Sequence, residues 1–133
     1  MKQEETELLL KYLCMALYYK VKCKIHYTFN NETTFGEDVD AEKDDTLTKI
    51  DVELKTACFD WYGDCLDIDE IKPYLRLLSN MTEEEKAELF QLMGNGTDIQ
   101  RIDFYLSHHF DFMGLIQKGL AIEVTEGNNP YKE

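Results

Sequence analysis

Basic residues are scarce in this sequence of 133 residues, which has 14 Lys and Arg against 27 Asp and Glu and a formal net charge of −13. A chain with this balance repels phosphate, which argues against direct binding to nucleic acid. Long apolar runs are also missing. The best candidate, residues 8–19, is interrupted by Lys11 and falls short of the roughly 18 residues that a membrane span needs. We therefore expect binding to neither nucleic acid nor a membrane.

An export signal and paired cysteine motifs are lacking as well. The N-terminus has no basic segment and no cleavage site of small residues, so we expect a cytoplasmic protein. The four cysteines, Cys14, Cys23, Cys58 and Cys65, do not have the CxxC spacing of zinc ribbons or thioredoxin-like redox sites. In the cytoplasm we expect them to be reduced and to serve as small apolar side chains.

What the chain does contain is apolar and aromatic residues, at 44% and 12% of the sequence, enough to bury a core despite the charge. Its length predicts a single domain, which we place at residues 1–125 with a loose tail at 126–133. The acidic excess is local. Residues 37–70 hold thirteen acids and three bases, whereas residues 1–36 are slightly basic.

Hydrophobic periodicity predicts an α+β fold. Residues 20–29 alternate between apolar and polar or basic side chains, which is the clearest strand signal in the chain. Apolar residues at intervals of three and four predict helices, and two capping boxes mark helix starts at Thr82 and Thr97. The expected helices span about 4–17, 83–93, 98–110 and 112–118, and the expected strands about 20–29, 47–54, 57–62 and 65–68.

This order predicts an N-terminal helix, a small antiparallel sheet, of which an SH3-like partial barrel is one form, and a C-terminal helical segment. Residues 30–46, between the first two strands, are mostly Asn, Thr, Asp and Glu. We expect them to form a long, solvated acidic loop.

Two acidic groups make up the expected binding surface. In the first, at residues 37–45, Lys43 stands where an EF-hand requires Gly, which excludes a calcium loop. The second surrounds Trp61 and Tyr62, and nothing in its spacing indicates the converging carboxylates of a hydrolase. The binding residues we expect are Asp38, Asp40, Glu42, Asp44, Asp45, Asp60, Trp61, Tyr62, Asp64, Asp67 and Asp69.

An alternative site lies at residues 107–111, where two imidazoles and a carboxylate fall within five residues. Neighbouring helical positions diverge by ~100°, so His108 and His109 are poorly placed to hold one ion. We expect one histidine to pack against the core and the other to lie near carbonyls at the helix C-terminus. Together with Asp111, they remain the centre of an alternative enzymatic hypothesis.

Recognisable catalytic and cofactor motifs are otherwise missing. The sequence has no Gly-rich phosphate loop, no G-x-S-x-G elbow and no activated-cysteine signature. Cys23 and His26 are three apart in the expected strand and point to opposite faces, which argues against zinc. We expect no cofactor, no metal and no catalytic residue, so a non-enzymatic protein is favoured.

The segments IKPYLRLLSNMTEEE at residues 71–85 and HHFDFMGLI at residues 108–116 carry a resemblance, and the opening helix followed by KVKCKI at residues 20–25 adds to it loosely. They are similar to a family of small uncharacterised proteins encoded in phages, prophages and mobile elements of gut bacteria. That family has no assigned activity. The resemblance therefore implies a setting, the cytoplasm of an infected or lysogenic bacterium, and not a reaction.

We therefore expect an accessory or regulatory protein of a phage or mobile element that binds a host or phage protein with a basic surface. Two alternatives stay open. One is an acidic mimic of nucleic acid that blocks a DNA- or RNA-binding protein, which would need carboxylates spaced like phosphates on a rigid surface. The other is a small metal-dependent or acid–base enzyme that uses His108, His109 and Asp111. The oligomeric state is left open.

Overall fold

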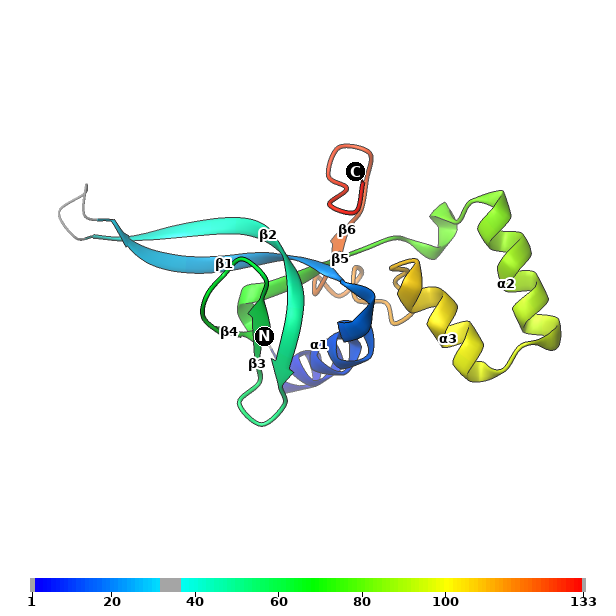
Figure 1. Ribbon diagram of the computed structural model, residues 1–133, viewed down its shortest axis with the longest axis horizontal. Coiled ribbons are helices and arrows are strands. Elements are labelled where there is room, and N and C mark those ends of the chain that lie inside the picture. Colours follow the sequence, from blue (N-terminus) through cyan, green and yellow to red (C-terminus); the bar gives the residue numbers. More distant parts are fainter. Residues whose placement is uncertain (1, 32–36, 133) are drawn as a thin grey trace. The chain divides into compact units, whose positions relative to one another are not determined.

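The computed structural model describes residues 2–31 and 37–132, which fall into two compact units, Met1–Pro73 and Tyr74–Glu133 (Figure 1). The α+β class predicted from the sequence is confirmed. The elements, with η denoting a 3-10 helix, are α1 (Gln3–Ala16), η1 (Leu17–Tyr19), β1 (Lys22–Asn31), β2 (Glu37–Asp51), β3 (Thr56–Phe59), β4 (Leu66–Asp67), η3 (Ile68–Glu70), β5 (Ile71–Leu75), η4 (Leu78–Asn80), α2 (Glu83–Asn95), α3 (Asp98–Ser107) and β6 (Ile122–Glu123). None of the helices in the described part of the chain has the length and apolar character needed to cross a membrane.

The first unit consists of α1 and a curled antiparallel sheet in the strand order β4-β3-β2-β1-β5. β1 pairs with β2 over all of its 10 residues, and Figure 1 shows this hairpin extending well beyond β3 and β4. The inward residues of β1, Cys23 and Ile25, are buried, as are Leu9 and Leu13 of α1. The apolar stripe of α1 and the inward-facing residues of β1 thus form the core of this unit.

Helices supply most of the regular secondary structure of the second unit. The last two residues of β5 pair in parallel with β6, and α2 and α3 form a helical hairpin. Both helices begin at the predicted capping boxes, where Thr82 and Thr97 accept the N–H of the residue three positions later. α2 ends where the N–H of Gly96 bonds to the carbonyl of Leu92, and a Cβ at Gly96 would lie only 2.6 Å from that oxygen.

α2 is unusual in what it buries. Its one buried side chain is a carboxylate, Glu85, while Phe90 and Met93 are 80% and 67% exposed. Apolar packing therefore contributes little to holding this helix in place.

The expectation of an acidic loop is wrong for residues 37–46, which belong to β2. They pair residue by residue with β1, and the side chains of residues 38–44 alternate between exposed and partly buried. The second strand consequently covers Glu37–Asp51 and not 47–54. The remaining part of the expected loop, 32–36, lies outside the described residues.

The expected helix at 112–118 is wrong as well, because these residues form turns. The carboxylate of Asp111 accepts the N–H groups of Leu115 and Ile116, at 2.7 and 3.0 Å. Gly114 and Gly119 both have a positive φ, which ends any helical repeat.

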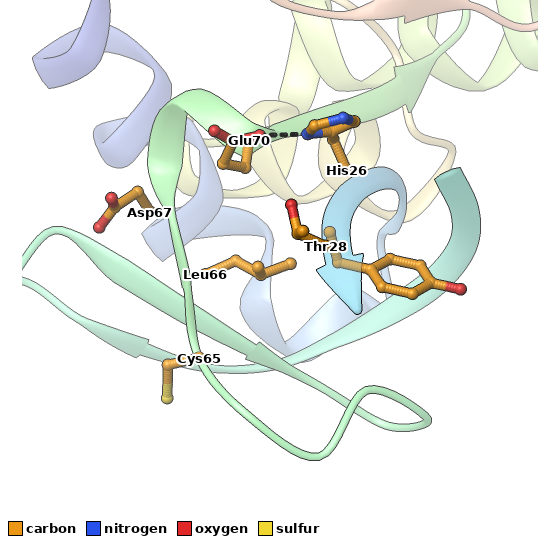
Figure 2. Close-up of a pocket in the computed structure, with 7 residues that line it drawn as sticks. His26, Thr28, Cys65, Leu66, Asp67 and Glu70 are labelled. Atoms are coloured by element: carbon orange, nitrogen blue, oxygen red, sulfur yellow. Dashed lines mark hydrogen bonds and ion pairs between the residues drawn. The ribbon is translucent and has the colours of Figure 1, made fainter. Parts of the chain in front are cut away.

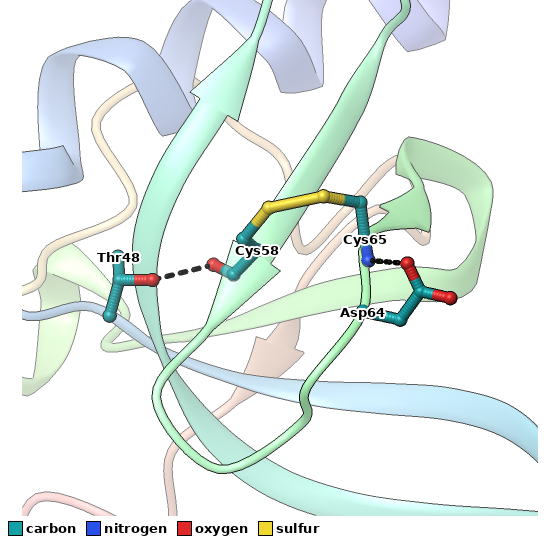
Figure 3. The surroundings of a disulfide bond; sticks show 4 residues. All are labelled: Thr48, Cys58, Asp64 and Cys65. Atoms are coloured by element: carbon teal, nitrogen blue, oxygen red, sulfur yellow. Dashed lines mark hydrogen bonds between the residues drawn. A yellow bond between two sulfur atoms is a disulfide. The ribbon is translucent and has the colours of Figure 1, made fainter.

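The expectation of four reduced cysteines is wrong for Cys58 and Cys65, which form a disulfide (Figure 3). The reason is the register of β3 with β4. Ala57 pairs with Leu66, so the two cysteines that follow and precede them face each other at a Cα–Cα distance of 4.6 Å. The bond closes the loop that carries Trp61. The other two cysteines are free.

Candidate binding surface

Four carboxylates line one face of the β1–β2 hairpin. Successive residues of a strand point to opposite faces, so Asp38, Asp40, Glu42 and Asp44 share a face, and all four are exposed. Alternate residues of a strand are roughly 7 Å apart, which gives a regular row of charge. We call these four residues the acidic face.

The neighbouring strand balances part of this charge. Across the hairpin, the Lys24 Nζ lies 3.9 Å from the Glu42 Oε2, and the Thr28 hydroxyl donates to the Asp40 Oδ1 at 3.0 Å. Ion pairs exposed to this degree contribute little to stability. Because these contacts balance only part of the charge, the acidic face remains net negative. It is also largely solvated, so another molecule can reach it.

His26, on the same face of β1, lies between two further carboxylates. Its Nδ1 is 2.7 Å from the Glu70 Oε2 and its Nε2 is 4.0 Å from the Asp40 Oδ2. The hydrogen bond that the His26 imidazole donates to Glu70 raises the pKa of His26, and the charges of both carboxylates add to the effect. This arrangement favours an imidazolium ion in that position.

His26 and Glu70 point toward one another at the edge of a 260 Å³ pocket that Asp67 also lines (Figure 2). Sites for small organic ligands usually measure ~300–1,000 Å³ and are mostly apolar. The pocket is smaller and mixed in polarity, so its residues are better described as part of the charged surface than as an active site.

Asp45 does not belong to the acidic face. It lies on the opposite face of β2, is 6% exposed, and accepts the backbone N–H groups of Thr46, Trp61 and Tyr62 at 2.8, 3.1 and 2.9 Å. A carboxylate with three such donors is a structural anchor. Asp45 therefore fixes the loop that leads from β3 toward β4.

Trp61 and Tyr62 lie against Tyr27 of β1. The Tyr27 ring centroid is 5.7 Å from that of Trp61 and 5.2 Å from that of Tyr62. We call these three rings the aromatic corner. The Lys43 Nζ lies 4.0 Å from the centroid of the Trp61 ring, which is 54% exposed.

The other expected binding residues are exposed and more dispersed. Asp60 and Asp64 border the Trp61-Tyr62 pair in the sequence, and the Asp64 carboxylate accepts the N–H of Cys65 at 2.8 Å (Figure 3). Asp67 lies in β4 and Asp69 in η3.

The residues of the alternative site do not converge in the structure. His109 has a φ of 60° and stacks on Tyr131 with 3.8 Å between ring centroids, and burial lowers its pKa to about 4. The Asp111 carboxylate is occupied by two backbone N–H groups of the following turn. Across the described residues, no cluster of three or more His, Cys, Asp or Glu side chains is arranged to hold a metal ion.

His108 belongs instead to an ionic cluster on α2. Its Nδ1 is 3.1 Å from the Glu85 Oε2 and its Nε2 is 3.7 Å from the Glu88 Oε2. Glu85 also receives two hydrogen bonds from the Arg76 guanidinium, at 2.7 and 2.8 Å. The bonds from Arg76, together with the Thr82 cap, lower the pKa of Glu85 to about 2.

Sequence reasoning missed Asp45 as an anchor and Tyr27, Lys43 and His26 as parts of the surface. The alternation that identified β1 already placed His26 outward and Tyr27 inward. Extending the same alternation back from Leu47 would have placed Asp45 and Lys43 inward as well.

Comparison with known protein families, curated proteins and solved structures found no match to this chain.

Proposed function

We propose that this is a non-enzymatic accessory or regulatory protein that binds a protein partner with a basic surface through the acidic face. The observation that carries the proposal is the row of four exposed carboxylates on a paired strand, Asp38, Asp40, Glu42 and Asp44. Charge held on a regular strand loses less conformational freedom on binding than charge on a loop, which favours complementary association.

The charge density of this row argues against the nucleic-acid mimic. Duplex DNA carries one negative charge per roughly 1.7 Å of helix axis, whereas the acidic face carries one carboxylate per roughly 7 Å of strand. The adjacent strand contributes Lys24 and His26 in place of a second row of anions. The charge density is therefore well below that of a duplex, which favours a basic protein surface as the partner.

A purely protective role is the main competing explanation. β2 pairs with β3 only from Leu47 onward, so within the described residues 38–44 are paired on one side, by β1. Charged side chains on such an edge discourage aggregation whatever their sign. A test must therefore reverse the charge without removing it.

The decisive experiment compares Asp40→Lys/Glu42→Lys with a control, Glu4→Lys/Glu7→Lys, which changes two exposed acids of α1 by the same charge. Partners from a bacterial lysate are captured on each protein and identified, and binding is measured against salt concentration. We expect the hairpin variant to lose a partner that the control and the original protein retain, with binding that weakens as salt rises. Equal capture by the hairpin variant, with solubility unchanged, would leave the acidic face with a protective role only.

The setting of this function is also part of the proposal. The resemblance of residues 71–85 and 108–116 to phage and mobile-element proteins supports a bacterial cytoplasm. Disulfides in that compartment are rare and usually transient. The Cys58–Cys65 bond is then expected to form and break with the redox state of the cell.

A further inference from the structure

The loop that carries Trp61 is held from several directions. The Asp45 carboxylate binds the N–H groups of Trp61 and Tyr62, and the N–H of Asp60 bonds to the carbonyl of Thr46 at 3.0 Å. The disulfide closes the same loop between residues 58 and 65 (Figure 3). A large ring that is positioned in advance loses little freedom when it binds a ligand.

The three rings of the aromatic corner are inclined to one another. The planes of Tyr27 and Trp61 meet at 60°, and those of Tyr27 and Tyr62 at 43°. Stacked rings cover each other's faces, whereas inclined rings leave faces accessible. The face of an aromatic ring is its negative side, so such corners attract cations, and quaternary ammonium groups above all.

A cation already lies on this surface. Lys43 of β2 is on the same strand face as Tyr27, and its ammonium sits 4.0 Å from the centroid of the Trp61 ring. Trp61 nevertheless remains 54% exposed. The chain's own lysine thus shows which chemical group the Trp61 face accepts.

We propose that the aromatic corner of Tyr27, Trp61 and Tyr62 is a binding site for an alkylammonium group, the cation of a lysine or methylated lysine side chain, and that Lys43 competes for it. The exposed carboxylates of Asp60 and Asp64 border the site in the sequence and add attraction for a cation. The corner lies on the opposite face of the hairpin from the acidic face, so this inference does not depend on the proposed function.

The assay uses the fact that Trp61 is the only tryptophan in the chain. Its fluorescence is titrated with tetramethylammonium, with acetyl-trimethyllysine amide and with acetyl-lysine amide. The neutral control is the trimethyllysine analogue in which carbon replaces the ammonium nitrogen. We expect a saturable change with the cations, strongest for the trimethylated lysine, and none with the neutral analogue.

Variants separate this site from unspecific attraction. Lys43→Gln removes the internal competitor and should tighten binding about two- to fivefold, whereas Tyr27→Leu should weaken it about two- to fivefold. Tyr18→Leu, at a position 90% exposed in η1, should leave affinity unchanged. If Tyr27→Leu does not fold, as judged by circular dichroism, the Lys43→Gln result decides alone.

The inference is overturned if the neutral analogue changes the fluorescence as strongly as its cation, or if Lys43→Gln binds no more tightly than the original protein. Binding of tetramethylammonium without either lysine compound would restrict the site to small free ammonium ions and contradict a lysine ligand.

Discussion

Replacing Glu85 by Gln should destabilise the second unit by an amount that depends on pH. Glu85 is 9% exposed and receives two hydrogen bonds from Arg76. Its pKa falls from an ordinary value of 4.5 to about 2. Since each tenfold change in proton affinity equals about 1.4 kcal/mol, the ionised form contributes at most roughly 3 kcal/mol.

The sign of the pH dependence follows from the lowered pKa. A carboxyl group whose pKa is lowered by folding stabilises the folded state at pH values above its pKa in the unfolded chain. That stability is lost as the pH falls from about 4.5 to about 2. Glutamine does not titrate, so Glu85→Gln should lower the free energy of unfolding near neutral pH and remove this part of the acid sensitivity.

The assay is urea unfolding followed by far-ultraviolet circular dichroism, which reports the helices, over the same pH range. Glu84→Gln is the matched control, because it removes an acid from the same helical turn at an exposed position. The control accounts for the interaction with the helix dipole, worth about 0.3–1 kcal/mol. The reasoning is refuted if Glu84→Gln costs as much as Glu85→Gln, or if Glu85→Gln keeps the acid sensitivity of the original protein.

Three further outcomes are expected. Glu70→Gln should lower the pKa of His26, because it removes the carboxylate that raises it; proton NMR titration of the imidazole measures this, and an unchanged titration would contradict the contact. Reducing the disulfide, which closes a short loop, should cost the first unit about 2 kcal/mol; urea unfolding followed by Trp61 fluorescence measures the loss, and an unchanged midpoint would count against it. Gly96→Ala should destabilise the protein because the new Cβ would lie 2.6 Å from a carbonyl oxygen. Gly94 has open space around it, so Gly94→Ala should stabilise α2 by up to about 1 kcal/mol. The thermal unfolding temperatures of the two variants should therefore shift in opposite directions.

Features that depend on neighbouring residues in the chain were predictable. The capping boxes at Thr82 and Thr97 begin α2 and α3, and the alternation at residues 20–29 gives β1, because each signal lies within a few residues of the structure it specifies.

Features that depend on pairing were not predictable in the same way. Asp and Glu are poor strand formers, so the composition of residues 37–46 predicts a loop. They form β2 because β1, in which apolar and basic or polar side chains alternate, pairs with them residue by residue. His26, for example, lies opposite Glu42. The disulfide likewise follows from the register of β3 with β4, which spacing along the chain does not reveal.

The candidate surface, too, could be predicted from the sequence only in part. Composition located the acidic region, but only the strand register separates the exposed carboxylates of Asp40 and Glu42 from the buried carboxylate of Asp45. A count of charges treats the three as equal. In the fold, two are exposed to solvent and one holds Trp61 in place.

The composition of α2 also bears on how the protein is degraded. A helix whose one buried side chain is Glu85 gains little from the hydrophobic effect, so it should open locally before the rest of the chain unfolds. Proteases cut such transiently opened segments at a rate set by how often they are open. We therefore expect the ion pair between Arg76 and Glu85 to affect the lifetime of the protein in the cell, and changes at this pair to alter its abundance without touching the acidic face.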